Sequence, residues 1–209
     1  MQNLSKCFFA LLFVSLVGCG GARSTPESTF EAMKEAARNQ DTKSMVAVLT
    51  PDSVDFMIKT QMSYCFEGYV REVHPDELPE HKKRETPDTA RTVDVFVAAK
   101  EHGVDLEILK RITEDGDGTP LKEIYAEAAD SITDKFGFLA RTMEIGHEFE
   151  VSSGREGRVY SVWEDATISD IKEDGGAATG TVKMKGRESE FHFRKIDNQW
   201  RVHYPESER

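Results

Sequence analysis

The fold of this chain is decided near its end, by the stretch Phe191-His192-Phe193-Arg194-Lys195-Ile196-Asp197-Asn198-Gln199-Trp200-Arg201-Val202. Apolar and polar side chains alternate on both sides of Asp197-Asn198, which is the period of a half-buried β-strand. Asp and Asn tolerate the left-handed backbone that tight hairpin turns require. The stretch therefore predicts two antiparallel strands, 188–196 and 199–204, joined by a short turn.

The same alternation continues toward the N-terminus and predicts further strands over 159–163, 166–171 and 179–185. Turn-forming residues rich in Asp and Gly separate these segments, so consecutive hairpins are expected. One side of the strands is apolar, and the opposite side carries basic and imidazole side chains. We interpret that side as an interaction face, made of Lys183, Lys185, His192, Arg194, Arg201 and His203.

Upstream of the sheet, apolar residues recur at the helical period. We expect helices from a cap at Ser28 or Thr29 to Arg38, after Asp41, from Pro51 to about Val70, over 89–101, around 106–112, and from Pro120 to Leu139. Helices followed by hairpins predict an α+β fold with N-terminal helices packed on a curved antiparallel sheet. The expected organisation is a single domain over 28–209 with a helical insertion at about 86–147.

The first residues have the pattern of an export signal. An apolar run over 8–17, too short to span a bilayer, follows Lys6 and ends in Leu16-Val17-Gly18-Cys19. This tetrapeptide resembles the lipobox of bacterial lipoproteins, which implies a signal peptide over 1–18, an acylated (palmitate-type) Cys19 as membrane anchor, and a flexible tether over 19–27. Gly20 after the cysteine resembles the pattern of outer-membrane sorting. The implied location is the bacterial cell envelope, at the periplasmic face of the outer membrane in a two-membraned cell.

The composition limits the partners. The formal net charge is −11, which argues against nucleic acid because nucleic-acid binding favours dense Lys and Arg. After removal of the signal and acylation of Cys19, Cys65 would have no partner for an intrachain disulfide. Cys65 lies in the apolar run Met62-Ser63-Tyr64-Cys65-Phe66 and is expected to be a small core residue.

Three segments together carry a family resemblance: Glu27-Ser28-Thr29-Phe30-Glu31-Ala32-Met33, Val48-Leu49-Thr50-Pro51-Asp52-Ser53 and the closing hairpin. They resemble small bacterial lipoproteins of the nuclear transport factor 2-like superfamily. The resemblance implies a cone-shaped fold in which helices and sheet can enclose a pocket. It implies no particular chemistry, because that superfamily includes enzymes, binding modules and interaction domains.

We identify no catalytic, cofactor-binding or metal-binding motif. Asp115-Gly116-Asp117-Gly118 resembles a calcium-binding loop in its Asp and Gly content. The first carboxylate and the closing Glu of such a loop are missing, however. His192 and His203 could form an acid–base pair with Asp170 or Glu190, although strand parity favours a solvated face.

The leading interpretation is a lipid-anchored, non-enzymatic envelope protein that binds a protein, a polymer or a small ligand. The first alternative is a hydratase or isomerase with an Asp or His general base in the cone, and the second is a structural or assembly role.

Residues 183–201 contain six basic and three acidic residues, whereas 105–134 contain nine acidic and three basic. These regions could attract each other within one molecule or between copies. Attraction between copies would lead to a homo-oligomer.

Overall fold

The computed structural model describes residues 23–77, 86–114, 119–154 and 158–205. The calcium-like residues 115–118, the lipobox and Cys19 lie outside the described residues. Within them, no helix is both long and apolar enough to cross a membrane. The fold is α+β, as the sequence predicts, with helices and a single four-stranded antiparallel sheet.

Most helices begin at a side chain that caps them. The described helices are α1 (Pro26–Arg38), α2 (Thr42–Ala47), α3 (Pro51–Val73), α4 (Pro87–Glu101), α5 (Leu106–Glu114), α6 (Leu121–Ser131), α7 (Lys135–Ser152) and α8 (Arg158–Ser161), with a 3₁₀ turn at Pro75–Glu77. Thr25, Asp41, Thr50, Thr86 and Asp134 accept hydrogen bonds from otherwise unpaired N–H groups of first turns. Proline follows three of these caps, where its missing N–H costs nothing.

The sheet is a meander of β1 (Thr167–Asp174), β2 (Ala177–Met184), β3 (Arg187–Ile196) and β4 (Gln199–His203), in that order. Phe193 lies opposite Val202, and the turn between β3 and β4 has positive φ at Asp197 and Asn198 (50° and 61°). The hairpin expected from the closing stretch is therefore confirmed. The chain between α2 and α3 covers the outer edge of β4, because Leu49 forms a parallel bridge to Val202.

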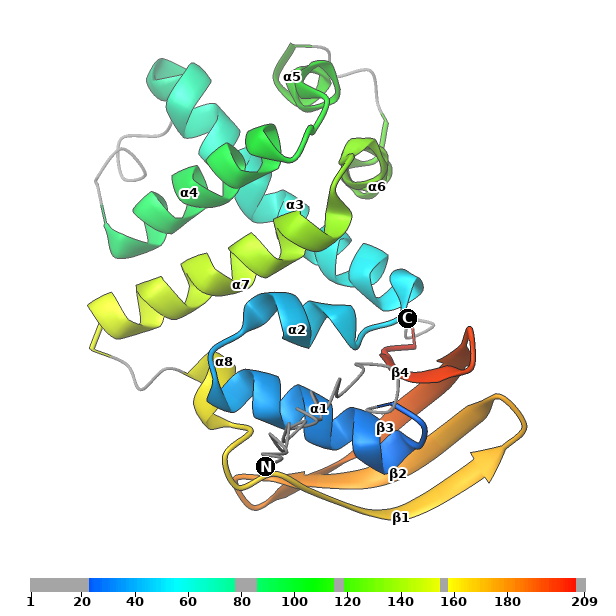
Figure 1. The fold of residues 1–209 in the computed structure, drawn as a ribbon. Helices are drawn as coiled ribbons and strands as arrows, with labels where there is room; N and C mark the ends of the chain where they lie inside the picture. The colour runs from blue at the N-terminus through cyan, green and yellow to red at the C-terminus, as the bar shows by residue number, and fades with distance from the viewer. Residues whose placement is uncertain (1–22, 78–85, 115–118, 155–157, 206–209) are drawn as a thin grey trace, which may run out of the picture.

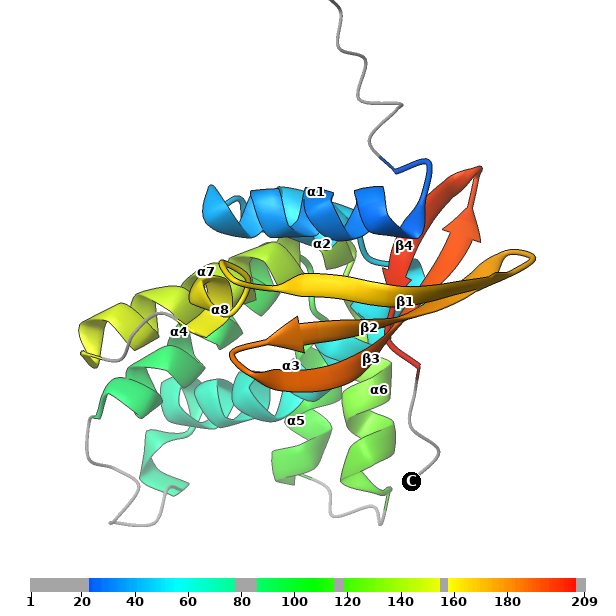
Figure 2. The same cartoon turned by 90° about the horizontal axis from the view of Figure 1, so that it is seen from below.

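The elements are arranged with the sheet and α1 at one end of the molecule and α5 and α6 at the other (Figure 1). The longer helices α3, α4 and α7 cross between these ends, and α1 lies along the twisted sheet in the view from below (Figure 2). Aromatic rings fill the space under α1: Phe30, Trp163 and Phe191 have centroids 6.0–6.3 Å apart. The buried face of the sheet is thus covered by aromatic side chains from α1, from the turn after α8 and from β3.

Three local expectations are wrong. The predicted strand over 159–163 is part of α8 and its closing turn, because Tyr160 and Trp163 are both buried at a helical spacing and the Trp163 N–H donates to the Tyr160 carbonyl. The helix predicted from Pro120 to Leu139 is broken: Ile132 is extended and Asp134 caps a new helix. The first helix is capped by Thr25 rather than Ser28 or Thr29, so it begins inside the expected tether.

Candidate functional site

The alternation expected along the last strands is present. Phe191 and Phe193 are buried, whereas His192 is half-buried and Arg194 is exposed. Cross-strand register places His192 opposite His203 and Arg194 opposite Arg201. Lys183 and Lys185 lie at the other end of β2, where Lys183 faces Glu188 across the hairpin and the Lys185 ammonium donates to Ser161 Oγ at 3.1 Å. The six residues of the predicted face therefore form two separate groups rather than one patch.

The second group contains His192, Arg194, Arg201 and His203, and within it Arg201 has a structural role. Its guanidinium donates to the backbone carbonyls of Ala47 and Leu49 at 3.2 and 3.3 Å. Arg23 also donates to the Ala47 carbonyl, at 2.5 Å. Because carbonyls at a helix end lack intrahelical donors, Arg201 ties the end of α2 to β4.

Arg194 and His203 form a connected polar cluster with the first turn of α3. The Arg194 guanidinium bonds to Asp52 Oδ2 at 3.0 Å and to His203 Nε2 at 3.1 Å. A guanidinium can only donate, so Nε2 accepts and the imidazole proton resides on Nδ1. That Nδ1–H then donates to Thr50 Oγ1 at 3.2 Å. This assignment requires a neutral His203.

The interior end of the cluster is fully buried. Thr50 and Ser53 have no exposed surface, their hydroxyl oxygens are 2.6 Å apart, and the Tyr204 N–H donates to Ser53 Oγ at 2.8 Å. Buried polar groups of this kind are stabilising only when every member is bonded. The hydroxyl pair therefore locks the end of β4 onto the start of α3.

Burial lowers the pKa of His203, and the positive charge of Arg194 acts in the same direction, as does His192 more weakly. The carboxylate of Asp52 opposes these effects. Since the ordinary pKa of histidine is near 6.5, His203 is mostly neutral at neutral pH. The pKa shift and the hydrogen-bond pattern agree on the same protonation state.

A groove of about 310 Å³ opens beside this cluster, lined by Asp52, Asp55, Lys59, His203 and Tyr204. Asp55 is held by Lys135 at 2.8 Å, whereas the Lys59 ammonium has no partner among the described residues. Burial raises the pKa of Tyr204 to about 12, so its hydroxyl stays protonated and can donate. The groove therefore offers the positive charge of Lys59 beside the Arg194–Asp52 pair.

The sequence patterns do not point to the side of this groove that α3 contributes. Asp52, Asp55 and Lys59 are spaced by three and four residues, which places them on one face of α3. That spacing is a signal of a shared helix face, but it does not reveal that β4 lies against it. The expected acid–base partners are placed differently: Glu190 reaches His192 at 3.2 Å, whereas no described contact joins Asp170 to either histidine.

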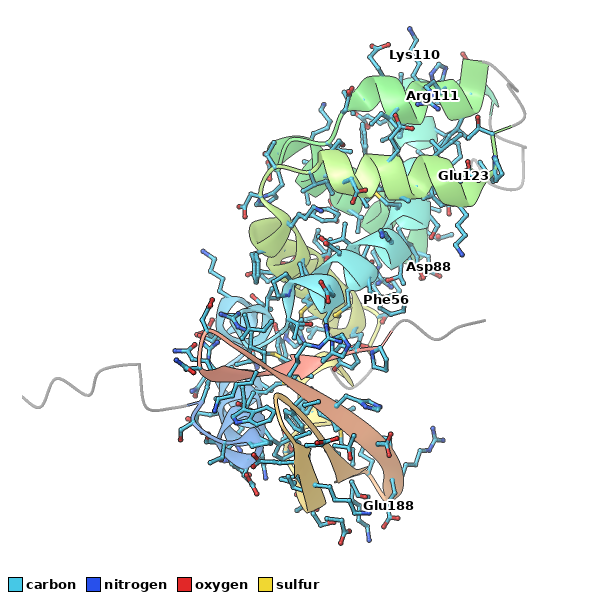
Figure 3. All side chains as sticks on the ribbon, turned by 90° about the vertical axis from the view of Figure 1, so that its right-hand side faces the viewer. Phe56, Asp88, Lys110, Arg111, Glu123 and Glu188 are labelled. Atoms are coloured by element: carbon cyan, nitrogen blue, oxygen red, sulfur yellow. The ribbon has the colours of Figure 1, made fainter. Side chains whose placement is uncertain are left out.

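The acidic insertion and the sheet lie at opposite ends of the molecule. Figure 3 shows Lys110, Arg111 and Glu123 on α5 and α6 far from Glu188 at the end of the sheet. Acidic side chains of the insertion pair locally, as in Glu127 with Arg111 and Asp134 with His102. Among the described residues, no ion pair joins the insertion to the sheet.

Two further candidate chemistries are metal binding and reaction of the Cys65 thiol. No group of three or more His, Cys, Asp or Glu side chains converges there on a metal-sized site. Cys65 is fully buried, as predicted, and burial raises its thiol pKa to about 12. A thiol with so high a pKa is unreactive at neutral pH.

Comparison with protein-family models gives no match for this chain, and comparisons with curated proteins and with solved structures give none either.

Proposed function

We propose that this protein is an exported lipoprotein, anchored through acyl chains on Cys19, and that it binds a partner near the membrane surface. The support for the anchor is the lipobox-like Leu16-Val17-Gly18-Cys19. Arg23 already belongs to the fold, because its carbonyl accepts a hydrogen bond from the Trp200 N–H. The four residue-to-residue steps from Cys19 to Arg23 reach at most about 14 Å, so the sheet end of the fold would lie close to the lipid.

The binding role rests on one observation, the groove between α3 and β4. Its Lys59 ammonium has no partner among the described residues, whereas Arg194 bonds to both Asp52 and His203. Preorganised polar groups beside free donors suit a partner that accepts hydrogen bonds, such as an envelope protein or polymer bearing carboxylate or hydroxyl groups. The aromatic filling under α1 favours surface binding over chemistry in an enclosed cavity.

The nuclear transport factor 2-like cone is part of this proposal. A helix lying along a twisted antiparallel meander, with the chain before α3 bridged to the last strand, is compatible with that fold. In this interpretation α4, α5, α6 and most of α7 are the insertion, and they extend the helical end away from the cone.

Two experiments test the proposal. Metabolic labelling with a fatty-acid analogue in a lipoprotein-processing bacterium should mark the wild type and not Cys19→Ser, and labelling of both would contradict the anchor. A photo-crosslinking residue at Lys59 should capture a discrete envelope component, whereas the same group at exposed Glu164 should not. Identical crosslinking patterns at both positions would contradict a binding role for the groove.

One observation favours the enzymatic alternative, a hydratase or isomerase with a histidine base. His203 is neutral and borders the groove, as a general base at neutral pH must. Its Nε2 already accepts from Arg194, however, so a substrate would have to displace the guanidinium. A screen of hydratase and isomerase substrates with wild type and His203→Gln decides this, because only histidine-dependent turnover supports the enzyme.

Self-association through the basic residues of the sheet, which lie in two separate groups, is the third proposal. Replacing Lys183, Lys185 and Arg194 by Glu should weaken any association at low salt, since charge attraction between copies falls when one partner reverses sign. Sedimentation velocity measures this, and an unchanged profile would exclude the charge-driven contact.

A further inference from the structure

A second groove, of about 220 Å³, lies between α4 and α7 and is separate from the groove at His203. It is lined by Ala90, Arg91, Asp94, Ile145, Glu148, Phe149 and Ser152. Arg91 and Asp94 lie one turn apart on α4 but form no ion pair with each other. The groove thus presents both signs of charge beside an apolar wall.

The close crossing of α3 and α4 positions the Arg91 side chain. A Cβ on Gly68 would lie 2.0 Å from the Thr92 carbonyl oxygen, so only glycine permits this approach of the two backbones. Tyr64 lies one turn before Gly68, and Arg91 directly precedes Thr92. The crossing consequently brings the Arg91 guanidinium over the Tyr64 ring, with Cζ 4.9 Å from its centroid.

A second ring, from α7, holds the same guanidinium: Arg91 Cζ lies 5.5 Å from the centroid of Phe149. Aromatic rings interact with the face of a guanidinium and leave its in-plane N–H groups for hydrogen bonds. Among the described residues, Arg91 has no hydrogen-bond acceptor, and its Nε is shielded from solvent without one. The guanidinium is therefore in contact with two rings and has no acceptor within the described ranges.

The two carboxylates that line the groove differ in their availability. Glu148 accepts a hydrogen bond from Arg141 at 3.0 Å, whereas exposed Asp94 has no partner among the described residues. As far as the described residues show, Arg91 and Asp94 are therefore a free cation and a free anion that line the same small groove, with Ile145 and Phe149 beside them.

We propose that this groove binds a small zwitterion, an α-amino acid with an apolar side chain. The carboxylate of the ligand pairs with Arg91, because a guanidinium edge binds a carboxylate through two parallel hydrogen bonds. The ammonium group pairs with Asp94, and the apolar side chain contacts Ile145 and Phe149. The volume of about 220 Å³ suits a single residue.

The test is calorimetric titration of the full-length protein with L-leucine, L-leucinamide and 4-methylpentanoate. Leucine should bind with a millimolar Kd, and each analogue, which lacks one charged group, should bind about tenfold more weakly or not at all. Arg91→Met should abolish leucine binding, and Arg187→Met, at the exposed β2–β3 turn, should leave it unchanged.

A second variant separates binding from folding. Asp94→Asn alters one exposed atom, so circular dichroism should show an intact fold. The variant should bind leucine more weakly than the wild type and should bind 4-methylpentanoate equally well. Equal binding of leucine and 4-methylpentanoate, unchanged binding by folded Arg91→Met, or no heat with leucine at about 20 mM would each overturn the proposal. None of these outcomes bears on the membrane anchor or on the groove at His203.

Discussion

Gly68→Ala tests how closely α3 and α4 cross. The added methyl group would sit 2.0 Å from the Thr92 carbonyl oxygen and 2.7 Å from Phe96 Cβ. Neither contact is with the flexible end of a side chain, so the helices themselves must separate. Overpacking of this kind costs roughly 1–3 kcal/mol, and a clash with backbone places it at the upper end of that range.

The opposing contribution is helix propensity. Alanine in a helix interior is about 1 kcal/mol more favourable than glycine. The net expectation is a loss of about 2 kcal/mol of folding free energy, which corresponds to a fall in Tm of about 4–8 °C for a chain of this size. Thermal and urea denaturation followed by circular dichroism measure both quantities.

The matched control is Gly176→Ala, because a Cβ at Gly176 meets nothing within 4 Å and its φ is not in the left-handed region. Its folding free energy should change by less than about 0.5 kcal/mol. If Gly68→Ala instead stabilises the protein by about 1 kcal/mol, propensity alone governs the site and the close crossing is refuted. The argument that this crossing orients Arg91 would then fail as well.

Three further predictions concern the pH dependence, a helix cap and the buried thiol. Because the pKa of His203 is lowered in the folded state, its neutral form stabilises the fold above about pH 6.5, and this contribution is lost as the pH falls through the folded pKa. Urea denaturation at a series of pH values should show this loss of folding free energy. The same loss in a His203→Asn variant would contradict the role of His203. Thr25→Ala removes the cap of α1 and should lower the folding free energy by about 1 kcal/mol, whereas exposed Thr60→Ala, inside α3, should have a smaller effect in the same melts. Cys65, with a pKa raised to about 12, should resist a thiol-reactive dye at about pH 8 until urea unfolds the chain, and rapid labelling of the native protein would show that the site is open.

The sequence predicts the local elements well where their causes are local. The turn at Asp197-Asn198, the capping Asp41 and the proline at the start of α3 are each encoded within a few neighbouring residues. The errors arise where tertiary contacts override local pattern. The predicted strand over 159–163 is helical, since Tyr160 and Trp163 pack on elements that precede them by many residues.

The candidate site shows the same division. Strand parity correctly places His192 and His203 on the polar side, yet it cannot show that Arg201 turns to α2 or that Asp52 meets Arg194. Thr50 and His203, which bond through their side chains, are 153 residues apart. Their meeting depends on where α3 begins relative to the edge of β4, and no periodicity within either segment contains that information.

The sequence by itself determined the α+β class, the antiparallel hairpins and the side of each late strand that faces water, because turn chemistry and side-chain alternation act over a few residues. Only the tertiary structure decided which charged groups are free and which are paired. Lys59, Arg91 and Asp94 resemble many other surface charges in the sequence, and their availability follows from neighbours on other helices. Packing assigns those neighbours, since a helix crossing such as the one at Gly68 is set by the fit of whole faces rather than by any one segment.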